Sequence, residues 1–456
     1  MDSDEGSIPN LISLSQIPVN YLQQIETDLL EPQVFNQGGT TRDGFCRFTL
    51  DRKGFLHSHS KLFLSVESAS TGVSAGYFNP VTGIGQVIKK AVLKIGNKTL
   101  NEVTSWDALF SAKSSLIKGE NNMEREFYTT GRFANFDFKY NDGSDVLADK
   151  IALETGYEYS ENDAIVPTWA KIDGNNVDQS PTFSIDLSDL FPFLKVNQLP
   201  LYMISEPVVI ELTFYPTQGY RIQVDSTDDT GTQANVRRSD IKFCADYVFY
   251  TEGDMMERFA NANKNMTFSF VDYRGIELTT TQATLGSGII RNLGMANRVV
   301  PRVITTVVDS AQGETDILPG TANALSPALT AGVPGTIAYN IRYNDRYEFT
   351  SDVDNTARLF SILTDAEGVP FLSRARYSHQ KDTITTNTLQ GRAQNTGFGG
   401  KSFFMGTKLT NGRVGQRGLE LHLTGGFPAE ADLVRSFCEY MRVARLSDGY
   451  FDVFNA

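Results

Sequence analysis

The chain is dominated by short segments in which apolar and polar residues alternate. A period of two turns one face of an extended strand toward a core and the other face away from it. Clusters of Gly, Pro, Asn and Asp separate these segments, as expected for a sandwich or barrel. The apolar faces are formed by Cys46, Phe48 and Leu50, by Leu62, Leu64 and Val66, by Val208, Ile210, Leu212 and Phe214, and by Leu419, Leu421 and Leu423. This pattern predicts an all-β protein.

Two segments, 105–118 and 352–363, have helical spacing instead. Each begins with residues that suit a helix N-cap. In each, a Thr-Ser pair precedes a Leu-Phe-Ser sequence, which ends at Ser111 in the first and Ser361 in the second. The candidate N-caps are Ser105 in the first segment and Ser351 or Asp352 in the second. A strand, a cap and a short helix are therefore predicted once in each half of the chain.

The two halves also match at their ends. An alternating strand, a polar loop and an aromatic strand follow one another from Ile210 to Cys244 and again from Leu419 to Cys438. A duplicated β domain explains both similarities with one assumption, and the alternative is chance similarity among residues common in strands. The positions expected to superpose are Leu109 with Leu359 and Cys244 with Cys438.

The polar, helix-compatible stretch between the halves suggests the domain boundary. The expected divisions are an N-terminal arm at 1–30, a first domain at 31–250, a linker at 251–265 and a second domain at 266–456. The arm contains an amphipathic piece outside the repeat. Each domain also carries a long insertion, at 141–180 with nine acidic residues against two lysines, and at 309–335 with many Gly, Pro, Ala and Thr residues. We expect both insertions to be exterior loops.

Composition supports this prediction and excludes several classes of protein. The 456 residues include 30 Phe, 18 Tyr and 38 Gly, a balance that favours aromatic strands joined by turns. No apolar run approaches the ~20 residues that a membrane-spanning helix requires. The 54 acidic residues exceed the 41 basic ones, which gives a formal charge of −13. This charge repels phosphate backbones, so we expect no sequence-specific nucleic-acid binding.

The segment 395–402 ends in Gly400-Lys401-Ser402 and is similar to a phosphate-binding loop. Such a loop needs Gly where Asn395 stands, a buried strand before it and a helix after it. The flanking residues indicate neither element. We therefore favour a flexible Gly-rich loop over a nucleotide site and expect no cofactor.

Histidine and cysteine provide little material for a metal or catalytic site. His57 and His59 could hold a metal with a third ligand, but no partner stands at a familiar spacing, so a polar turn is favoured. His379 and His422 stand alone, and no Gly-x-Ser-x-Gly sequence is present. The cysteines form no CxxC pair and are interpreted as small buried residues in a reducing compartment. They are Cys46, Cys244 and Cys438. We expect no metal site and no catalytic residue.

Two neighbouring segments resemble a known family. Residues 183–195 read Phe-Ser-Ile-Asp-Leu-Ser-Asp-Leu-Phe-Pro-Phe-Leu-Lys, and residues 199–214 read Leu-Pro-Leu-Tyr-Met-Ile-Ser-Glu-Pro-Val-Val-Ile-Glu-Leu-Thr-Phe. This succession of a strand, a Phe-Pro-Phe-Leu turn, a Leu-Pro pair and an alternating strand resembles double jelly-roll major capsid proteins, particularly those of virophages and polinton-like viruses. With the duplicated halves, the resemblance covers most of residues 31–456.

The resemblance implies two eight-stranded sandwiches in tandem and a structural function without an active site. Three chains would form a pseudo-hexagonal homotrimeric capsomer in the icosahedral shell of a double-stranded DNA virus, assembled inside the host cell. The implied partners are the chain itself, neighbouring capsomers, penton and minor capsid proteins, and an internal membrane. The alternatives are a cellular scaffold and a two-domain β-sandwich that binds or hydrolyses glycans. The glycan alternative would use a pair of carboxylates and Trp106 or Trp169 at a sugar site.

Overall fold

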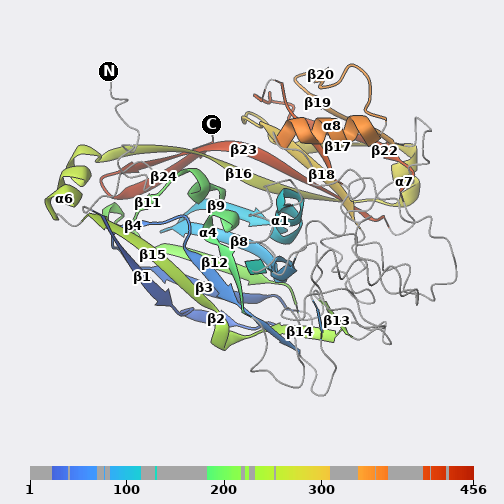
Figure 1. Ribbon diagram of the computed structural model, residues 1–456. Helices are drawn as coiled ribbons and strands as arrows, with labels where there is room; N and C mark the ends of the chain where they lie inside the picture. Colours follow the sequence, from blue (N-terminus) through green and yellow to red (C-terminus); the bar gives the residue numbers. More distant parts are fainter. Residues whose placement is uncertain are drawn as a thin grey trace.

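The computed structural model consists mainly of antiparallel strands arranged as two sandwiches (Figure 1). In the part of the chain that the structure describes, no helix is long and apolar enough to cross a membrane. The described residues are 23–39, 42–68, 76–77, 83–114, 129–130, 182–216, 221–224, 232–250, 253–308, 337–354, 356–367, 404–410, 412–427 and 431–455.

The first sandwich packs two antiparallel sheets against each other. Phe48 of one sheet lies 5.9 Å, between ring centroids, from Phe243 of the other. One sheet contains, in spatial order, β1 (Gln23–Leu30), β15 (Lys242–Tyr250), β5 (Lys61–Leu64) and β10 (Phe183–Asp186), with β4 (Phe55–Leu56) and β11 (Leu199–Pro200) beside the end of β15. The other contains β2 (Val34–Asn36), β3 (Gly44–Leu50), β12 (Val208–Phe214), β8 (Ile88–Ile95) and β9 (Lys98–Thr104). A small further sheet contains β6 (Val66–Ser68), β14 (Thr232–Val236), β13 (Arg221–Val224) and β7 (Gly76–Tyr77).

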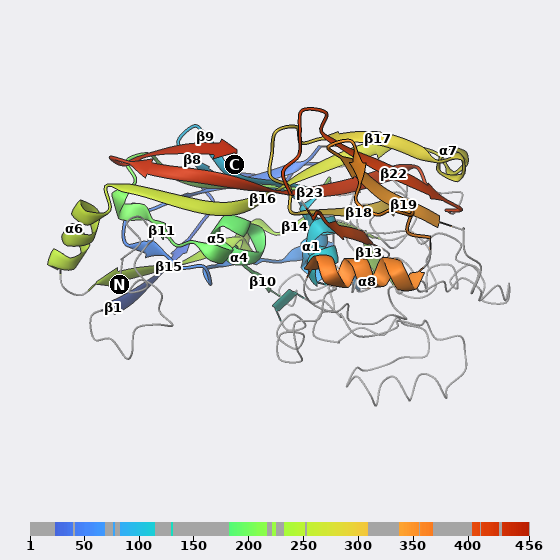
Figure 2. The ribbon, with the colours of Figure 1, turned by 90° about the horizontal axis from the view of Figure 1, so that it is seen from above.

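The second sandwich is built in the same way. Thr407 Oγ1 donates across it to Tyr339 Oη at 2.9 Å. One sheet contains β16 (Asn265–Thr279), β23 (Leu433–Ser447), β18 (Arg302–Val308) and β21 (Met405–Lys408), and β24 (Tyr450–Asn455) also pairs with β23. The other contains β17 (Ile289–Gly294), β22 (Leu419–Gly425), β19 (Ile337–Tyr343) and β20 (Arg346–Tyr347). The long strands β16 and β23 run together along most of the molecule (Figure 2).

Both sandwiches have the strand order of a jelly roll. If β2, β11, β24 and the small further sheet are set aside and β4 and β5 are counted as one interrupted strand, each sandwich has eight principal strands. One sheet then contains the first, eighth, third and sixth strands, and the other contains the second, seventh, fourth and fifth. The predicted all-β fold of two tandem jelly rolls is confirmed. Cys244 and Cys438 both lie on the eighth strand of their sandwich, as expected from the sequence.

Short helices occupy the connections between strands. The helix predicted from Ser105 is confirmed as α1 (Trp106–Ser114). A second helix, α8 (Thr356–Glu367), follows the fifth strand of the second sandwich. Leu109 and Leu359 therefore lie in equivalent connections. The helices are η2 (Gly83–Val87), α1 (Trp106–Ser114), α4 (Leu187–Leu190), α5 (Pro192–Val196), η5 (Leu201–Met203), η6 (Arg238–Asp240), α6 (Gly253–Ala262), α7 (Gln282–Ser287) and α8 (Thr356–Glu367). α6 falls in the predicted linker, and the exact domain boundaries stay a prediction.

The predicted start of the second helix is wrong. α8 begins at Thr356 and not at Ser351 or Asp352. Val353 forms an antiparallel bridge with Tyr339, and the Asp352 carboxylate accepts a hydrogen bond from Asn340 Nδ2 at 2.9 Å. These contacts hold Asp352 and Val353 in extended form against β19. The helix therefore begins only after them, at Thr356.

The predicted N-terminal arm at 1–30 is also wrong in part. Residues Gln23–Leu30 form β1, which pairs with the whole of β15, so they belong to the first sandwich. Leu30 packs against the core at the end of this strand. Removal of residues 1–30 would therefore delete an edge strand. Residues 1–22 and the predicted insertions at 141–180 and 309–335 lie outside the described residues.

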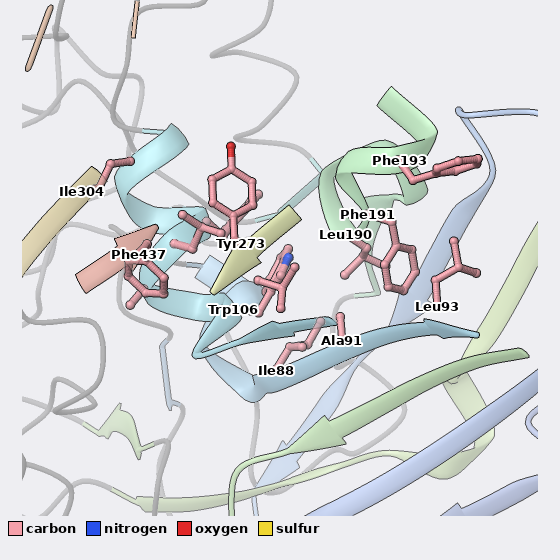
Figure 3. Close-up of a cluster of buried hydrophobic side chains, with 14 of the residues drawn as sticks. Ile88, Ala91, Leu93, Trp106, Leu190, Phe191, Phe193, Tyr273, Ile304 and Phe437 are labelled. Atoms are coloured by element: carbon pink, nitrogen blue, oxygen red, sulfur yellow. The ribbon is translucent and has the colours of Figure 1, made fainter. Parts of the chain in front are cut away.

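One hydrophobic core runs through both sandwiches. Trp106 of α1 lies in it and stacks on Phe110, with 4.5 Å between ring centroids. Figure 3 shows Trp106 in one cluster with Phe193 from the first sandwich and with Tyr273 and Phe437 from the second. The two sandwiches are therefore not separate domains joined only by a chain, because their apolar interiors are continuous.

We expect Trp106→Ala to lower the free energy of unfolding by about 3–5 kcal/mol, because it leaves a large cavity in this shared core. The measurement is urea unfolding followed by circular dichroism. Val196→Ala is the control, since Val196 is 68% exposed, and it should change stability by no more than about 0.5 kcal/mol. Equal effects of the two substitutions would contradict the structural role given to Trp106.

Candidate functional site: the seam between the sandwiches

The most elaborate set of side-chain contacts lies where the two sandwiches meet. Here β9, an edge strand of the first sandwich, lies beside β16, an edge strand of the second. The helix α5 lies against β16 next to it. We call this contact, formed by β9 and α5 on one side and by β16 and β23 on the other, the seam.

Aromatic side chains fill the apolar part of the seam. Phe193 of α5 reaches out of the first sandwich, and its ring centroid lies 5.0 Å from that of Phe270 and 5.6 Å from that of Phe268. Phe268 in turn stacks on Phe451 of β24 at 5.7 Å. All four side chains are buried. Since buried aromatic rings contribute large apolar areas, this cluster holds the two sandwiches together by the hydrophobic effect.

A buried carboxylate organises the polar part. Asp272 of β16 accepts hydrogen bonds from Asn101 Nδ2 at 3.1 Å, Arg442 Nη1 at 2.9 Å and Tyr440 Oη at 3.1 Å. The Asn101 Oδ1 atom accepts from the backbone N–H of Phe193 at 2.9 Å. Asn101 and Phe193 belong to the first sandwich, and the other three residues belong to the second. The carboxylate therefore has donors from both sandwiches.

The guanidinium of Arg442 completes this network from β23. It donates to the backbone carbonyl of Leu100 at 2.8 Å and to that of Thr99 at 3.2 Å. Both carbonyls belong to β9, whose outer edge would otherwise expose backbone acceptors. Arg442 of the second sandwich thus provides hydrogen-bond donors for backbone carbonyls at the edge of β9 in the first sandwich.

A second buried carboxylate, Glu439, extends the polar contacts. It accepts from Arg302 Nε and Nη2 at 3.0 and 2.8 Å and from Tyr273 Oη at 2.5 Å. Lys113 of α1 lies 3.8 Å from it and 5.4 Å from the ring centroid of Tyr273. Glu439 therefore links the first sandwich to β16, β18 and β23 of the second.

The two strands approach closely at a glycine. A Cβ atom at Gly275 of β16 would lie only 2.7 Å from Thr104 Oγ1 of β9. Beyond this point, Glu277 accepts from Ser105 Oγ at 2.9 Å and from Arg435 Nε at 2.9 Å. Ser105 belongs to the first sandwich and Arg435 to the second. The seam thus continues along β16 from Phe268 to Glu277.

The carboxylates Asp272 and Glu277 of the seam respond to their surroundings in opposite ways. Burial raises the pKa of Asp272 above its ordinary value, although Arg442 and Asn101 act against this rise. Burial also acts to raise the pKa of Glu277, but the charge of Arg435 and the hydrogen bonds from Ser105 and Arg435 outweigh it and lower the pKa. The Glu277 contact therefore favours the ionised form.

Comparison with known proteins supports what the topology indicates. No family model and no curated protein matches the sequence. A structure of the Sputnik virophage matches with a TM-score of 0.59 and 9% identity, covering 100% of this chain and 93% of that one. The Faustovirus major capsid protein matches with a TM-score of 0.54 and 9% identity over 95% and 92% of the two chains. The mavirus major capsid protein matches with a TM-score of 0.50 and 10% identity over 96% and 91%.

The chain has the double jelly-roll fold. The resemblance found around residues 183–214 is therefore confirmed for the fold, over nearly the whole chain. In the structure these residues form β10, α4, α5, β11, η5 and β12. The Phe-Pro-Phe-Leu turn of that resemblance contains Phe193, so the sequence feature that suggested the family also supplies the aromatic contact across the seam.

The structure places the predicted histidine pair in the connection between two strands of the first sandwich. His57 and His59 lie at the turn between β4 and β5, with their rings stacked at 5.0 Å between centroids. The pKa of His57 is lowered by burial and by the neighbouring charge of His59. Among the described residues, no group of three or more His, Cys, Asp or Glu side chains could hold a metal ion. His422 lies on β22, far along the chain from this pair.

Other candidate residues are buried or fall outside the described ranges. The expectation that Trp106 could serve as a sugar platform is wrong, because Trp106 is buried and its Nε1 donates to the carbonyl of Asp189 at 3.3 Å. Trp169, His379 and the loop 395–402 lie outside the described residues. Cys46 and Cys438 are buried and Cys244 is partly buried, all as free thiols. Burial raises the pKa of Cys438 to about 12.

Sequence reasoning missed the polar residues of the seam, although one signal could have revealed them. Met266, Phe268 and Phe270 alternate along β16 with their side chains buried, and Asp272 occupies the next inward position. A carboxylate at a position that the alternation assigns to the interior requires a buried partner. The pattern could not identify Arg442 as that partner, since 170 residues separate the two in the chain.

We expect Asp272→Ala to lower the free energy of unfolding by about 3–5 kcal/mol, because it leaves the Arg442 charge buried without its carboxylate. Asp452→Ala is the matched control. It breaks the Lys98–Asp452 ion pair, which crosses the same seam at 3.0 Å but is about half exposed, so its loss should cost no more than about 1 kcal/mol. Urea unfolding of both variants measures the difference, and similar losses would contradict the role assigned to burial.

We also expect stability to fall in acid partly through Glu277. Because the folded protein lowers the pKa of this carboxyl, the stabilisation is fully present above its ordinary value of 4.5 and is lost as the pH falls through the folded-state pKa. Glu277→Gln should therefore lose stability at neutral pH and show a shallower decline below 4.5. Urea midpoints across this pH range test the prediction, and parallel curves for the two proteins would refute it.

Proposed function

We propose that this chain is the major capsid protein of an icosahedral double-stranded DNA virus. The observation that carries the proposal is the pair of jelly rolls with identical strand order, sealed side by side through the seam. The virus capsid structures named above share this fold over more than nine-tenths of the chain. The chain then acts in the virion by shape and contact, not by catalysis.

The two sandwiches suit a tile that is built from three copies. Each chain contributes two similar blocks, so three chains present six blocks around one axis and fill a hexagonal position with a homotrimer. A seam with a continuous core keeps each pair of blocks rigid, as a tile requires. The same role implies neighbouring capsomers, penton and minor capsid proteins as partners, with an internal membrane as a further one.

The glycan alternative is less well supported. Its proposed platform at Trp106 is buried. The carboxylates with shifted pKa values, Glu211, Asp272 and Glu277, are each paired with a basic side chain. No observation within the described residues favours a sugar cleft over a structural role.

We expect the purified chain to be a trimer of about three times 50.5 kDa. A stable assembly of this kind buries a large area, often above ~2,000 Å², so the trimer should persist at micromolar concentration. Light scattering gives the mass, and electron microscopy should show pseudo-hexagonal outlines. A well-folded monomer at that concentration would refute the proposal.

A further inference from the structure

A short turn between β4 and β5 is bonded to neighbouring elements of the first sandwich. It consists of His57, Ser58, His59 and Ser60, and we call it the histidine turn. The backbone N–H of His57 donates to the carbonyl of Asp246 on β15 at 2.9 Å. The Ser60 Oγ atom donates to the carbonyl of His57 at 2.8 Å and accepts from the backbone N–H of Asp246 at 3.0 Å. Because Ser60 is fully buried, these bonds fix the turn against β15.

The histidine turn also supplies hydrogen-bond acceptors for the start of α4. The backbone N–H of Leu187 donates to the carbonyl of Ser60 at 2.8 Å. The backbone N–H of Ser188 donates to the carbonyl of Ser58 at 3.2 Å. The first N–H groups of a helix have no partner inside the helix, and the side chain of Asp186 at the N-cap does not bond to them. The start of α4 therefore depends on the carbonyls of the turn.

The helix α4 leads directly to the seam. Only Phe191 separates it from α5, whose Phe193 packs on the aromatic side chains of β16. The Nε1 atom of Trp106 donates to the carbonyl of Asp189 in α4 at 3.3 Å. A displacement of α4 would therefore reach both the seam and the shared core.

One hydrogen bond makes the histidine turn sensitive to protonation. The Nδ1 atom of His57 accepts from the backbone N–H of His59 at 3.2 Å. An imidazole nitrogen accepts a hydrogen bond only while it carries no proton, so the neutral ring with its proton on Nε2 is the form that fits. A second proton would set one N–H against another. It would also put a positive charge on a ring that stacks on His59 at 5.0 Å between centroids.

Charged residues lie on the elements that contact the histidine turn. They are Asp246 of β15, Lys61 of β5, Asp186 at the end of β10 and Asp189 of α4. Lys61 and Asp186 lie opposite each other in register. The carboxylate of Asp246 favours the protonated form of His57, and it also accepts a hydrogen bond from Thr27 Oγ1 of β1 at 2.7 Å.

The balance of these effects keeps His57 neutral. Burial and the charge of His59 outweigh Asp246 and place the pKa of His57 below its ordinary value of 6.5. An opened turn exposes the ring and returns the pKa toward 6.5, so the opened form takes up a proton more readily. The stability of the closed turn is fully present above 6.5 and is lost as the pH falls from there through the lowered pKa.

We propose that the histidine turn is an acid-sensitive switch, in which protonation of His57 opens the turn, frees the start of α4 and loosens the contact of Phe193 at the seam. The first step breaks the bond from the His59 N–H, and repulsion between the two rings favours the open form. The switch belongs to the folded chain, so it stands or falls independently of the proposed capsid function. In a shell of such chains, it would weaken the subunits in an acidic compartment.

Hydrogen exchange measured by mass spectrometry tests the switch in the full-length chain. Protection factors, which correct for the intrinsic pH dependence of exchange, are compared at about pH 7.5 and pH 5.5. A peptide covering 183–195 should lose protection roughly threefold or more in acid, because the lowered pKa shifts the opening equilibrium over this range. A peptide covering 208–214, on the opposite sheet, should keep its protection. An equal loss in both peptides, or a loss in neither, would overturn the inference.

Two asparagine substitutions assign the effect to one ring. His57→Asn removes the titrating ring and retains a side-chain oxygen that can accept the N–H of His59, so the loss of protection in acid should vanish. His59→Asn is the matched control, since it changes the other histidine and leaves the His57 acceptor in place, and a smaller loss should remain. A loss that persists in His57→Asn, or that vanishes only in His59→Asn, would contradict the proposed switch. If His57→Asn does not fold, the comparison of the two peptides in the parent chain still decides.

Tryptophan fluorescence provides an independent measurement on the core side of α4. The chain contains two tryptophans, so Trp169→Phe leaves Trp106 as the only one. Because Trp106 is buried and bonded to α4, its emission should move to longer wavelength between about pH 7.5 and pH 5.5. The shift should disappear when His57→Asn is added. An emission that does not move in acid would overturn the link from the turn to the shared core.

Discussion

The need to satisfy Asp272 without water determines how the two sandwiches meet. A buried carboxylate is costly unless charged and hydrogen-bonding partners surround it. Here the partners come from both sandwiches, so the carboxylate is fully bonded only when β9 lies against β16 in one register. Any sliding of the two strands would separate Asn101 from Asp272 and Arg442 from the carbonyls of β9.

Apolar and polar contacts contribute to the seam in different ways. Phe193 and the aromatic side chains of β16 provide most of the attraction, because burial of apolar area is not directional. The network around Asp272 and Arg442 adds geometric restriction more than net stability, since the cost of dehydrating an ion pair can offset its attraction. Gly275 permits the close approach that both kinds of contact need.

A rigid pair of sandwiches has a consequence for assembly. The seam occupies one edge of each sandwich, and exposed apolar side chains remain elsewhere, on β1, β17 and β20. Because the hydrophobic core is continuous across the seam, the two sandwiches pack in one relative orientation. A ring of such blocks can then close with a defined number of copies, which a flexible pair of domains would not ensure.

The sequence by itself determined the strands, the jelly-roll repeat and the family resemblance. Alternation in segments such as 208–214 depends only on which face of a strand is buried, and that information is local. The recurrence of matching segments was enough to predict two similar halves. The same local rules failed for residues 23–30 and for the start of α8, where pairing with β15 and β19 overrode the local pattern.

Only the tertiary structure decided what the seam is made of and which surfaces stay exposed. Asp272 and Arg442 are 170 residues apart, and Asn101 is about as far from Asp272, so no spacing in the chain links them. Ile25 and Ile290 look like ordinary strand residues in the sequence, and only the fold shows that their side chains stay exposed. The physical reason is that periodicity specifies which way a side chain points within its own strand, whereas partners and exposure depend on which strands the fold brings together.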